Sequence, residues 1–126
     1  MTPLLLSIHD WVRWAVLGMG VLSAVWTGVT WIRSRPVGPL DQRLSMAFVG
    51  LLDLQWLLGI AVFILKFSAP DLSVRIFHGG VMTVAVFAAH LVRIRARGAM
   101  DQDAPPHLVV GALLPLLIIA LGLRLW

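Results

Sequence analysis

Residues 44–65, LSMAFVGLLDLQWLLGIAVFIL, form a continuous apolar run that decides the class of fold. The run contains one ionisable residue, Asp53, and has the length of roughly 20 residues that a helix needs to cross a hydrocarbon core of about 30 Å. Lipid offers no hydrogen-bonding groups, so a segment of this kind satisfies its backbone as an α-helix. A barrel strand would be shorter and would alternate in polarity. The stretch therefore predicts a transmembrane helix.

Three further apolar runs lie on either side of this segment, at about residues 11–32, 76–94 and 106–123. The connections between the runs are rich in Pro, Gly, Asp and Arg, which favour turns. Of the 126 residues, 60% are hydrophobic and 13% are charged, which is too little polar surface to cover a water-soluble domain. Short connections make sequential helices antiparallel neighbours. We therefore expect a single all-α domain over residues 1–126, an integral membrane four-helix bundle with up-down-up-down order.

The basic residues indicate the orientation of this bundle. Nine of the ten are arginine, and six of the ten lie on the membrane side that carries the first and third connections. Cytoplasmic loops carry an excess of Lys and Arg. We therefore expect a multi-pass protein of the bacterial inner (cytoplasmic) membrane with both termini outside, and we interpret the basic excess as a topology signal with no nucleic-acid partner. The six residues are Arg33, Arg35, Arg43, Arg93, Arg95 and Arg97.

The four histidines form two pairs in this topology. His9 and His78 begin the first and third segments on one side of the membrane, whereas His90 ends the third segment and His107 begins the fourth on the other side. His78 and His90 are separated by 12 residues, or about 18 Å of helical rise, which is too far for one shared metal ion. The pairs predict one or two separate metal centres stacked across the membrane.

Haem b is the cofactor that these pairs favour. Imidazoles from facing helices can ligate a haem iron from both sides within a bundle. The sequence contains no cysteine, which excludes a thiolate metal site, an iron–sulfur cluster and a thioether-linked haem. The first and third helices are diagonal, roughly 11 to 14 Å apart if neighbours are spaced about 8 to 10 Å. Gly79 and Gly80 would leave room for a macrocycle beside His78.

Arginines that share a helix face with three of the histidines would bind the haem propionates. Each arginine lies three or four residues from its histidine, a spacing that brings side chains together on one helix face. The predicted cofactor-binding residues are His9, Arg13, Arg75, His78, His90, Arg93 and His107, with His9, His78, His90 and His107 as the metal ligands.

Asp53 and Gln55, in GLLDLQWLLG at residues 50–59, are polar residues within an apolar segment. An intramembrane carboxylate is costly and is therefore a candidate functional group. It could act in a proton relay, pair with a histidine or an arginine, or hydrogen-bond a quinone head group. Structural pairing with Arg43 or Arg93 is an equal alternative. We predict a quinone or proton site at Asp53 and Gln55.

Three stretches carry a family resemblance, namely IHDWVRW at residues 8–14, GLLDLQWLLG at 50–59 and RIFHGGVMTVAVFAAH at 75–90. They resemble small bacterial four-helix membrane proteins related to b-type cytochromes, such as the cytochrome b561 class and haem-bearing membrane anchors. The resemblance covers all four predicted helices and rests on the placement of His, Arg and Gly. It implies non-covalent haem b with His9, His78 and His90 as ligands, and electron exchange with a quinone pool or a partner protein. The 12-residue spacing between the histidines of the third helix is shorter than the spacing in dihaem cytochromes. The number of haems, one or two, is therefore left open.

Transmembrane electron transfer between quinol and a partner protein is the leading interpretation, with the chain as a membrane b-type cytochrome or cytochrome-like subunit. A non-redox accessory subunit of a larger respiratory or photosynthetic complex is one alternative. A copper-handling membrane protein is another, because imidazole and thioether groups in His9, His78 and Met82 suit copper. Small residues on the helix surfaces favour a homodimer or a larger membrane complex. The sequence contains no nucleotide-binding glycine loop, catalytic serine–histidine pattern or zinc-helix motif that would indicate hydrolysis.

Overall fold

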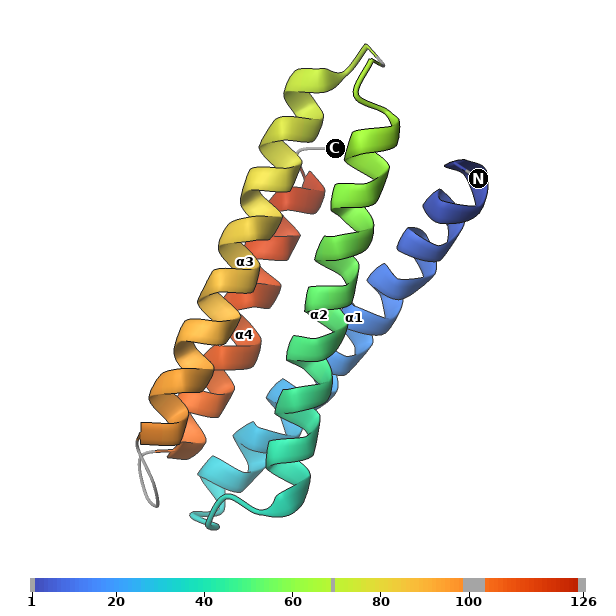
Figure 1. The fold of residues 1–126 in the computed structure, drawn as a ribbon. Helices are drawn as coiled ribbons and strands as arrows, with labels where there is room; N and C mark the ends of the chain where they lie inside the picture. Colours follow the sequence, from blue (N-terminus) through green and yellow to red (C-terminus); the bar gives the residue numbers. More distant parts are fainter. Residues whose placement is uncertain (1, 69, 99–103, 125–126) are drawn as a thin grey trace.

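A computed structural model describes residues 2–68, 70–98 and 104–124, and these fold into four long helices (Figure 1). All four are long and apolar enough to cross a membrane, and the described residues contain no strand. The prediction of an all-α, four-helix membrane bundle is confirmed, and the chain is a multi-pass membrane protein. The helices are α1 (Thr2–Ile32), α2 (Pro39–Leu65), α3 (Leu72–Gly98) and α4 (Ala104–Arg124).

The helices extend beyond the apolar runs from which they were predicted, most of all at the start of α1. This helix begins at Thr2 rather than at residue 11, with Pro3 in its first turn, where proline has the required backbone angle and lacks only an N–H that the helix leaves unpaired. The polar pair His9 and Asp10 interrupts the apolar run but does not interrupt the helix. His9 therefore lies inside α1 and does not begin it.

The bundle closes as a ring in which α1 packs against α2 and α4, and α3 packs closely against α4 and more loosely against α2. Helices α1 and α3 are diagonal, as the sequence predicted. Figure 1 shows the N-terminal half of α1 leaning away from the C-terminal half of α2. We call the end where α1 begins, α2 ends, α3 begins and α4 ends the termini end. The bundle is more open there than at the opposite end.

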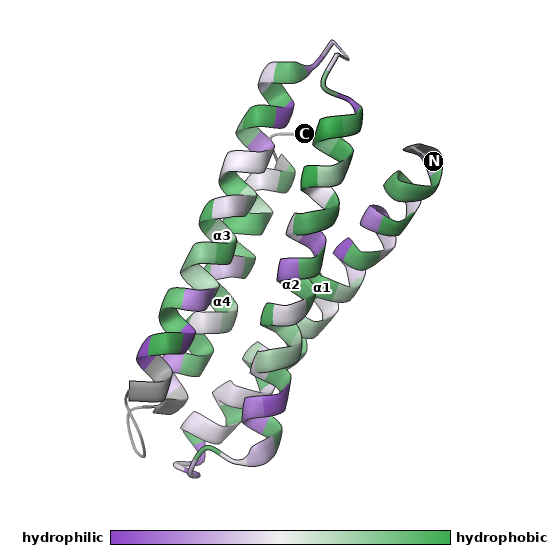
Figure 2. Cartoon of the chain, viewed as in Figure 1, coloured by the Kyte–Doolittle hydropathy of each residue, from purple (hydrophilic) through white to green (hydrophobic). Residues whose placement is uncertain are grey.

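Small residues set the close helix contacts of the core. A Cβ atom on Gly20 of α1 would lie 2.7 Å from the Leu116 side chain of α4 and 2.8 Å from the Phe48 side chain of α2. One on Gly122 of α4 would lie 2.8 Å from the Met82 side chain of α3. These side chains would have to shift to admit a larger residue. Many large apolar side chains are exposed on the outside of the bundle, where lipid would contact them. Hydrophobic residues run along all four helices (Figure 2). The buried apolar cluster comprises Val16, Phe48, Val49, Leu52, Ala85, Val86, Ala89 and Ile119.

A buried carboxylate fixes the connection between α1 and α2. Asp41 is 4% exposed, and its two oxygens accept hydrogen bonds from the Thr30 hydroxyl at 2.8 Å and from the Gly38 backbone N–H at 2.9 Å. The second bond caps the N-terminus of α2, where a negative charge is also favoured by the helix dipole. One side chain thus sets both the end of α1 and the start of α2.

We predict that Asp41→Ala lowers the free energy of unfolding by about 1 to 3 kcal/mol, because it leaves a hydroxyl and a backbone N–H buried without their acceptor. The measurement is equilibrium unfolding in mixed detergent micelles. Asp41→Asn retains one acceptor oxygen and should lose less. Equal stability of Asp41→Ala and the natural protein would show that Asp41 does not hold the connection.

Candidate functional site

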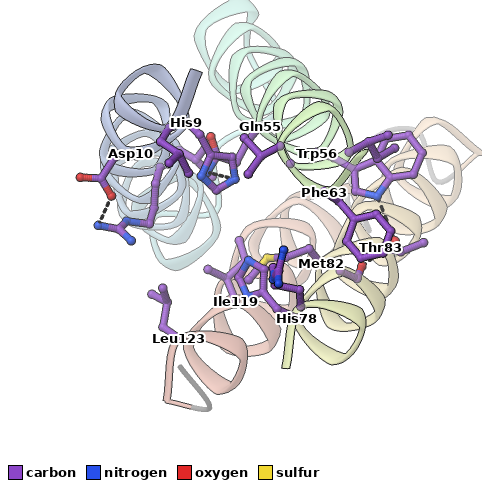
Figure 3. A pocket seen from close by; sticks show the side chains of 18 of the residues that line it. His9, Asp10, Gln55, Trp56, Phe63, His78, Met82, Thr83, Ile119 and Leu123 are labelled. Carbon is purple, nitrogen blue, oxygen red and sulfur yellow. Dashed lines mark hydrogen bonds and ion pairs between the residues drawn. The ribbon is translucent and has the colours of Figure 1, made fainter. Parts of the chain in front are cut away.

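A large cavity opens into the bundle at the termini end and is lined by residues from all four helices (Figure 3). Its volume is about 880 Å³, which lies within the range of sites for cofactors and drug-sized ligands. His9 from α1 and His78 from α3 both line it. The structure therefore brings together the first predicted histidine pair, from diagonal helices and at one end of the bundle. Further lining residues include Leu17, Leu52, Phe63, Met82, Val86 and Ile119.

His9 is held against α2 by an amide side chain. Its Nε2 atom lies 3.2 Å from Nε2 of Gln55, and a Cβ atom on Gly59 would lie 3.5 Å from the same imidazole nitrogen. Gly59 thus lets the imidazole approach the α2 backbone. The other amide atom, Oε1 of Gln55, is buried and has no hydrogen-bond partner among the described residues. Gln55, predicted as part of a quinone or proton site, is therefore a cavity residue that contacts a predicted ligand.

His78 is oriented by the backbone of α4. Its ring is hydrogen-bonded to the backbone of Gly122, and Figure 3 shows the ring beside Met82 and Ile119. An imidazole that donates one N–H to a backbone carbonyl presents its other nitrogen as an acceptor or a metal ligand. Gly79 lines the cavity next to His78, and a Cβ atom on Gly79 or Gly80 would meet nothing within 4 Å. Gly79 thus leaves open space on the cavity side of His78, whereas Gly80 does not line the cavity.

Trp56 and Thr83 bridge α2 and α3 along the cavity wall, a contact that the sequence pattern did not single out. The indole Nε1–H of Trp56 donates to the Thr83 hydroxyl at 2.9 Å, and that hydroxyl donates to the Gly79 carbonyl at 2.7 Å. A signal was available, because a tryptophan deep within an apolar segment needs an acceptor for its N–H. Thr83 is the hydroxyl residue on α3 that lies deep enough to provide one.

Charged residues surround the mouth of the cavity. Arg13 pairs with Asp10 at 2.5 Å and lies over the Trp14 ring, 5.3 Å from its centroid. Arg75 donates to the backbone carbonyl of Lys66 at the end of α2. Both predicted propionate-binding arginines of this end therefore line the cavity, together with Lys66. Arg13 is engaged by Asp10, whereas the sequence had related it to His9.

The second predicted site has a different geometry. Nε2 of His90 on α3 lies 2.8 and 3.0 Å from the two carboxylate oxygens of Asp53 on α2. His90 is therefore a hydrogen-bonding partner of Asp53, one of the alternatives that the sequence left open. The two side chains remain 45% and 39% exposed, respectively. Neither residue lines the cavity at the termini end.

The remaining predicted residues lie toward the opposite end of the bundle. Arg93 is partly buried on α3, and His107 is partly buried in the first turns of α4. The described residues contain no group of three or more His, Asp or Glu side chains arranged to hold a metal ion. Any centre in the described part of the chain would therefore depend on two histidines or on other donor types.

The fold and the cavity together define a four-helix, multi-pass membrane protein with a two-histidine cavity at one end. Comparison with known proteins gives no narrower class, because no protein-family model, curated protein or solved structure matches this chain. The resemblance to the cytochrome b561 class therefore stays a prediction.

We predict that Thr83→Val weakens the bridge between α2 and α3, because it leaves the Trp56 indole N–H without its acceptor. The expected loss is about 0.6 kcal/mol, the average for hydrogen bonds within a membrane bundle, and at most about 1.7 kcal/mol. Unfolding in mixed micelles, followed by tryptophan fluorescence, measures it. Thr83→Ser keeps the hydroxyl and should restore most of the stability, whereas equal losses in both variants would assign the effect to packing.

Proposed function

We propose that this chain is a membrane b-type cytochrome that binds one haem b between His9 and His78. The observation that carries the proposal is the convergence of these two imidazoles on one cavity from diagonal helices. Bis-histidine ligation from facing helices is a known way to hold haem in a bundle.

The residues of the cavity fit such a group. Its walls are mainly apolar, as the faces of a macrocycle require, and its volume of about 880 Å³ is sufficient for a large planar cofactor. Arg13, Lys66 and Arg75 line the cavity and are cations suited to propionates. Asp10 and Asp71 also line it, so Arg13 would exchange its ion pair with Asp10 for a propionate. The Oε1 atom of Gln55 marks a buried polar position that the described side chains do not satisfy.

The chain's own residues would orient and insulate the cofactor. When bound, haem supplies one-electron chemistry at its iron. The backbone of Gly122 fixes the His78 ring, and Gln55 fixes the His9 ring, which are partner contacts of the kind that tune metal-ligating histidines. Because Nε2 of His9 faces Gln55, ligation through that atom requires the amide contact to be exchanged.

We further propose that the protein acts in the bacterial cytoplasmic membrane and passes electrons between quinol and a partner protein. Its termini end, with the cavity, would face outward, since the opposite end carries the arginine clusters around the first and third connections. A homodimer or a docked complex would supply that partner.

We propose a single haem because His9 and His78 line one cavity, whereas neither His90 nor His107 lines it. His90 is also hydrogen-bonded through Nε2 to the charged Asp53 carboxylate. A second haem with His90 and His107 would require this pair to separate. The second haem remains a prediction from the sequence alone.

Copper binding is the second candidate, and one observation favours it. Met82 lies one turn from His78 and lines the same cavity as both histidines, so two imidazoles and a thioether, ligands suited to Cu(I), share one space. Copper found by metal analysis in a colourless purified protein would favour copper over haem.

We expect the protein purified from membranes to show the Soret and alpha bands of a reducible, low-spin haem b. His9→Ala and His78→Ala should each abolish the low-spin spectrum, because either variant removes one axial ligand. Met82→Leu, which keeps the apolar wall, is the matched control and should retain haem. A natural protein without these bands would refute the proposal. Bound copper in that protein, lost in Met82→Leu by metal analysis, would point to copper.

We also expect His90→Ala and His107→Ala to retain the haem content of the natural protein, because their side chains lie outside the cavity. Haem-to-protein ratio and the reduced-minus-oxidised spectrum are the measurements. A halved haem content in either variant would establish the second centre and contradict the single-haem proposal.

A further inference from the structure

The Asp53–His90 pair is accessible although it lies within the apolar spans of α2 and α3. Its side chains are 39% and 45% exposed, whereas Asp41, the other carboxylate within the α2 span, is 4% exposed. Hydrocarbon cannot hydrogen-bond to these groups, so leaving them exposed to lipid tails costs free energy. This pair therefore has the character of a binding group and not of a sealed structural contact.

The surroundings of the pair leave room for a flat, apolar ligand. A Cβ atom on Gly50, one turn before Asp53 on α2, would meet nothing within 4 Å. Phe87, one turn before His90 on α3, is 70% exposed, so an aromatic ring flanks the imidazole at a spacing that shares its helix face. Gly50 and Phe87 lie on the exposed outer surface, as do parts of Asp53 and His90. The pair can therefore be reached from the lipid where α2 and α3 meet.

The hydrogen-bonding capacity of the pair specifies the head group. A carboxylate has about four acceptor positions, and one imidazole N–H shared between its two oxygens leaves acceptor capacity for a hydroxyl. The imidazole N–H can in turn be shared with a carbonyl. An anionic phosphate would be repelled by the carboxylate. The pair therefore matches a neutral aromatic head group that carries hydroxyl or carbonyl oxygens.

We infer that Asp53 and His90 form the binding site for a lipid-soluble quinol or quinone, which enters between α2 and α3. The quinol hydroxyl would donate to the Asp53 carboxylate, and the carbonyl of the oxidised form would accept from His90. Asp53 lies three residues, or about 4.5 Å of helical rise, from Trp56 on the cavity wall. This inference rests on the proposed function, because a quinol bound here would be the electron donor beside the proposed haem cavity.

Photolabelling of the full chain in phosphatidylcholine liposomes tests this site, with a short-tailed azidobenzoquinone as the probe. We expect label on peptides of α2 and α3 that contain Asp53 or His90, displaced by an excess of the unmodified quinone. Asp53→Asn should reduce displaceable labelling by about tenfold, because Asp53 orients the His90 imidazole whose N–H would bind the probe carbonyl. Leu54→Asn places the same amide on an adjacent, 45% exposed position and should label normally.

A second variant keeps the test independent of the pair's own stability. Gly50→Leu leaves Asp53 and His90 unchanged but fills the open space beside them, and leucine is a better helix former than glycine. Displaceable labelling of this variant should also fall about tenfold, which corresponds to a loss of about 1.4 kcal/mol in binding free energy. Normal labelling of both Asp53→Asn and Gly50→Leu, or label confined to the termini end, would overturn the inference.

The absorption spectrum of the same samples separates this inference from the proposed function. A labelled Asp53 site in a protein without haem would sustain the quinone site and refute the cytochrome. A haem spectrum with label that is insensitive to both variants would sustain the cytochrome and overturn the site. Cross-linking of α2 to a second copy of the chain, in place of displaceable label, would likewise overturn it.

Discussion

Within the lipid-facing spans of this protein, a polar side chain has to find its partner on the protein, because hydrocarbon offers none. Among the described residues, such side-chain pairs between helices include His9 with Gln55, Trp56 with Thr83, and Asp53 with His90. A fourth contact, from Thr30 to Asp41, fixes the turn between α1 and α2. Each pair is satisfied at one helical register only, so together they set how α2 meets α1 and α3.

The same constraint explains why the bundle is unequal along its length. Around Gly20 the helices approach so closely that neighbouring side chains would have to shift to admit a Cβ atom, whereas toward the start of α1 the helix leans away and a cavity opens. The contacts that cross the open end are polar and specific: an amide on an imidazole, and an indole on a hydroxyl. Such contacts fix direction without filling space, which is the combination that a cofactor site requires.

Much of the fold could be predicted from hydropathy and connection length, because a membrane leaves the backbone few alternatives. The number of helices, their antiparallel order and the diagonal relation of α1 and α3 all followed from the apolar runs. The start of α1 was predicted too far along the chain, because His9 and Asp10 end an apolar run but do not break a helix. The joint position of His9 and His78 was also predictable, because topology alone brings both to one end.

The sequence could not predict how the helices that form the site are rotated about their own axes. Nothing in the sequence decides between His90 and Arg93 as neighbours of Asp53, since they lie within one turn of each other and the choice depends on how α3 is rotated. Arg43 lies ten residues, or about 15 Å of helical rise, before Asp53 on α2 itself, which is too far for direct contact. The Trp56–Thr83 bridge depends on the same rotation. Likewise, the pairing of Arg13 with Asp10 and not with His9 is a local choice between positions on one helix face.

Haem stoichiometry tests the central claim most directly. Purified chain of known concentration, assayed for total haem as the pyridine haemochrome, should contain one haem b per chain, because one cavity with two converging histidines supports one centre. A value of zero would contradict the cytochrome assignment, and a value of two would contradict the assignment of His90 to a hydrogen-bonded pair with Asp53.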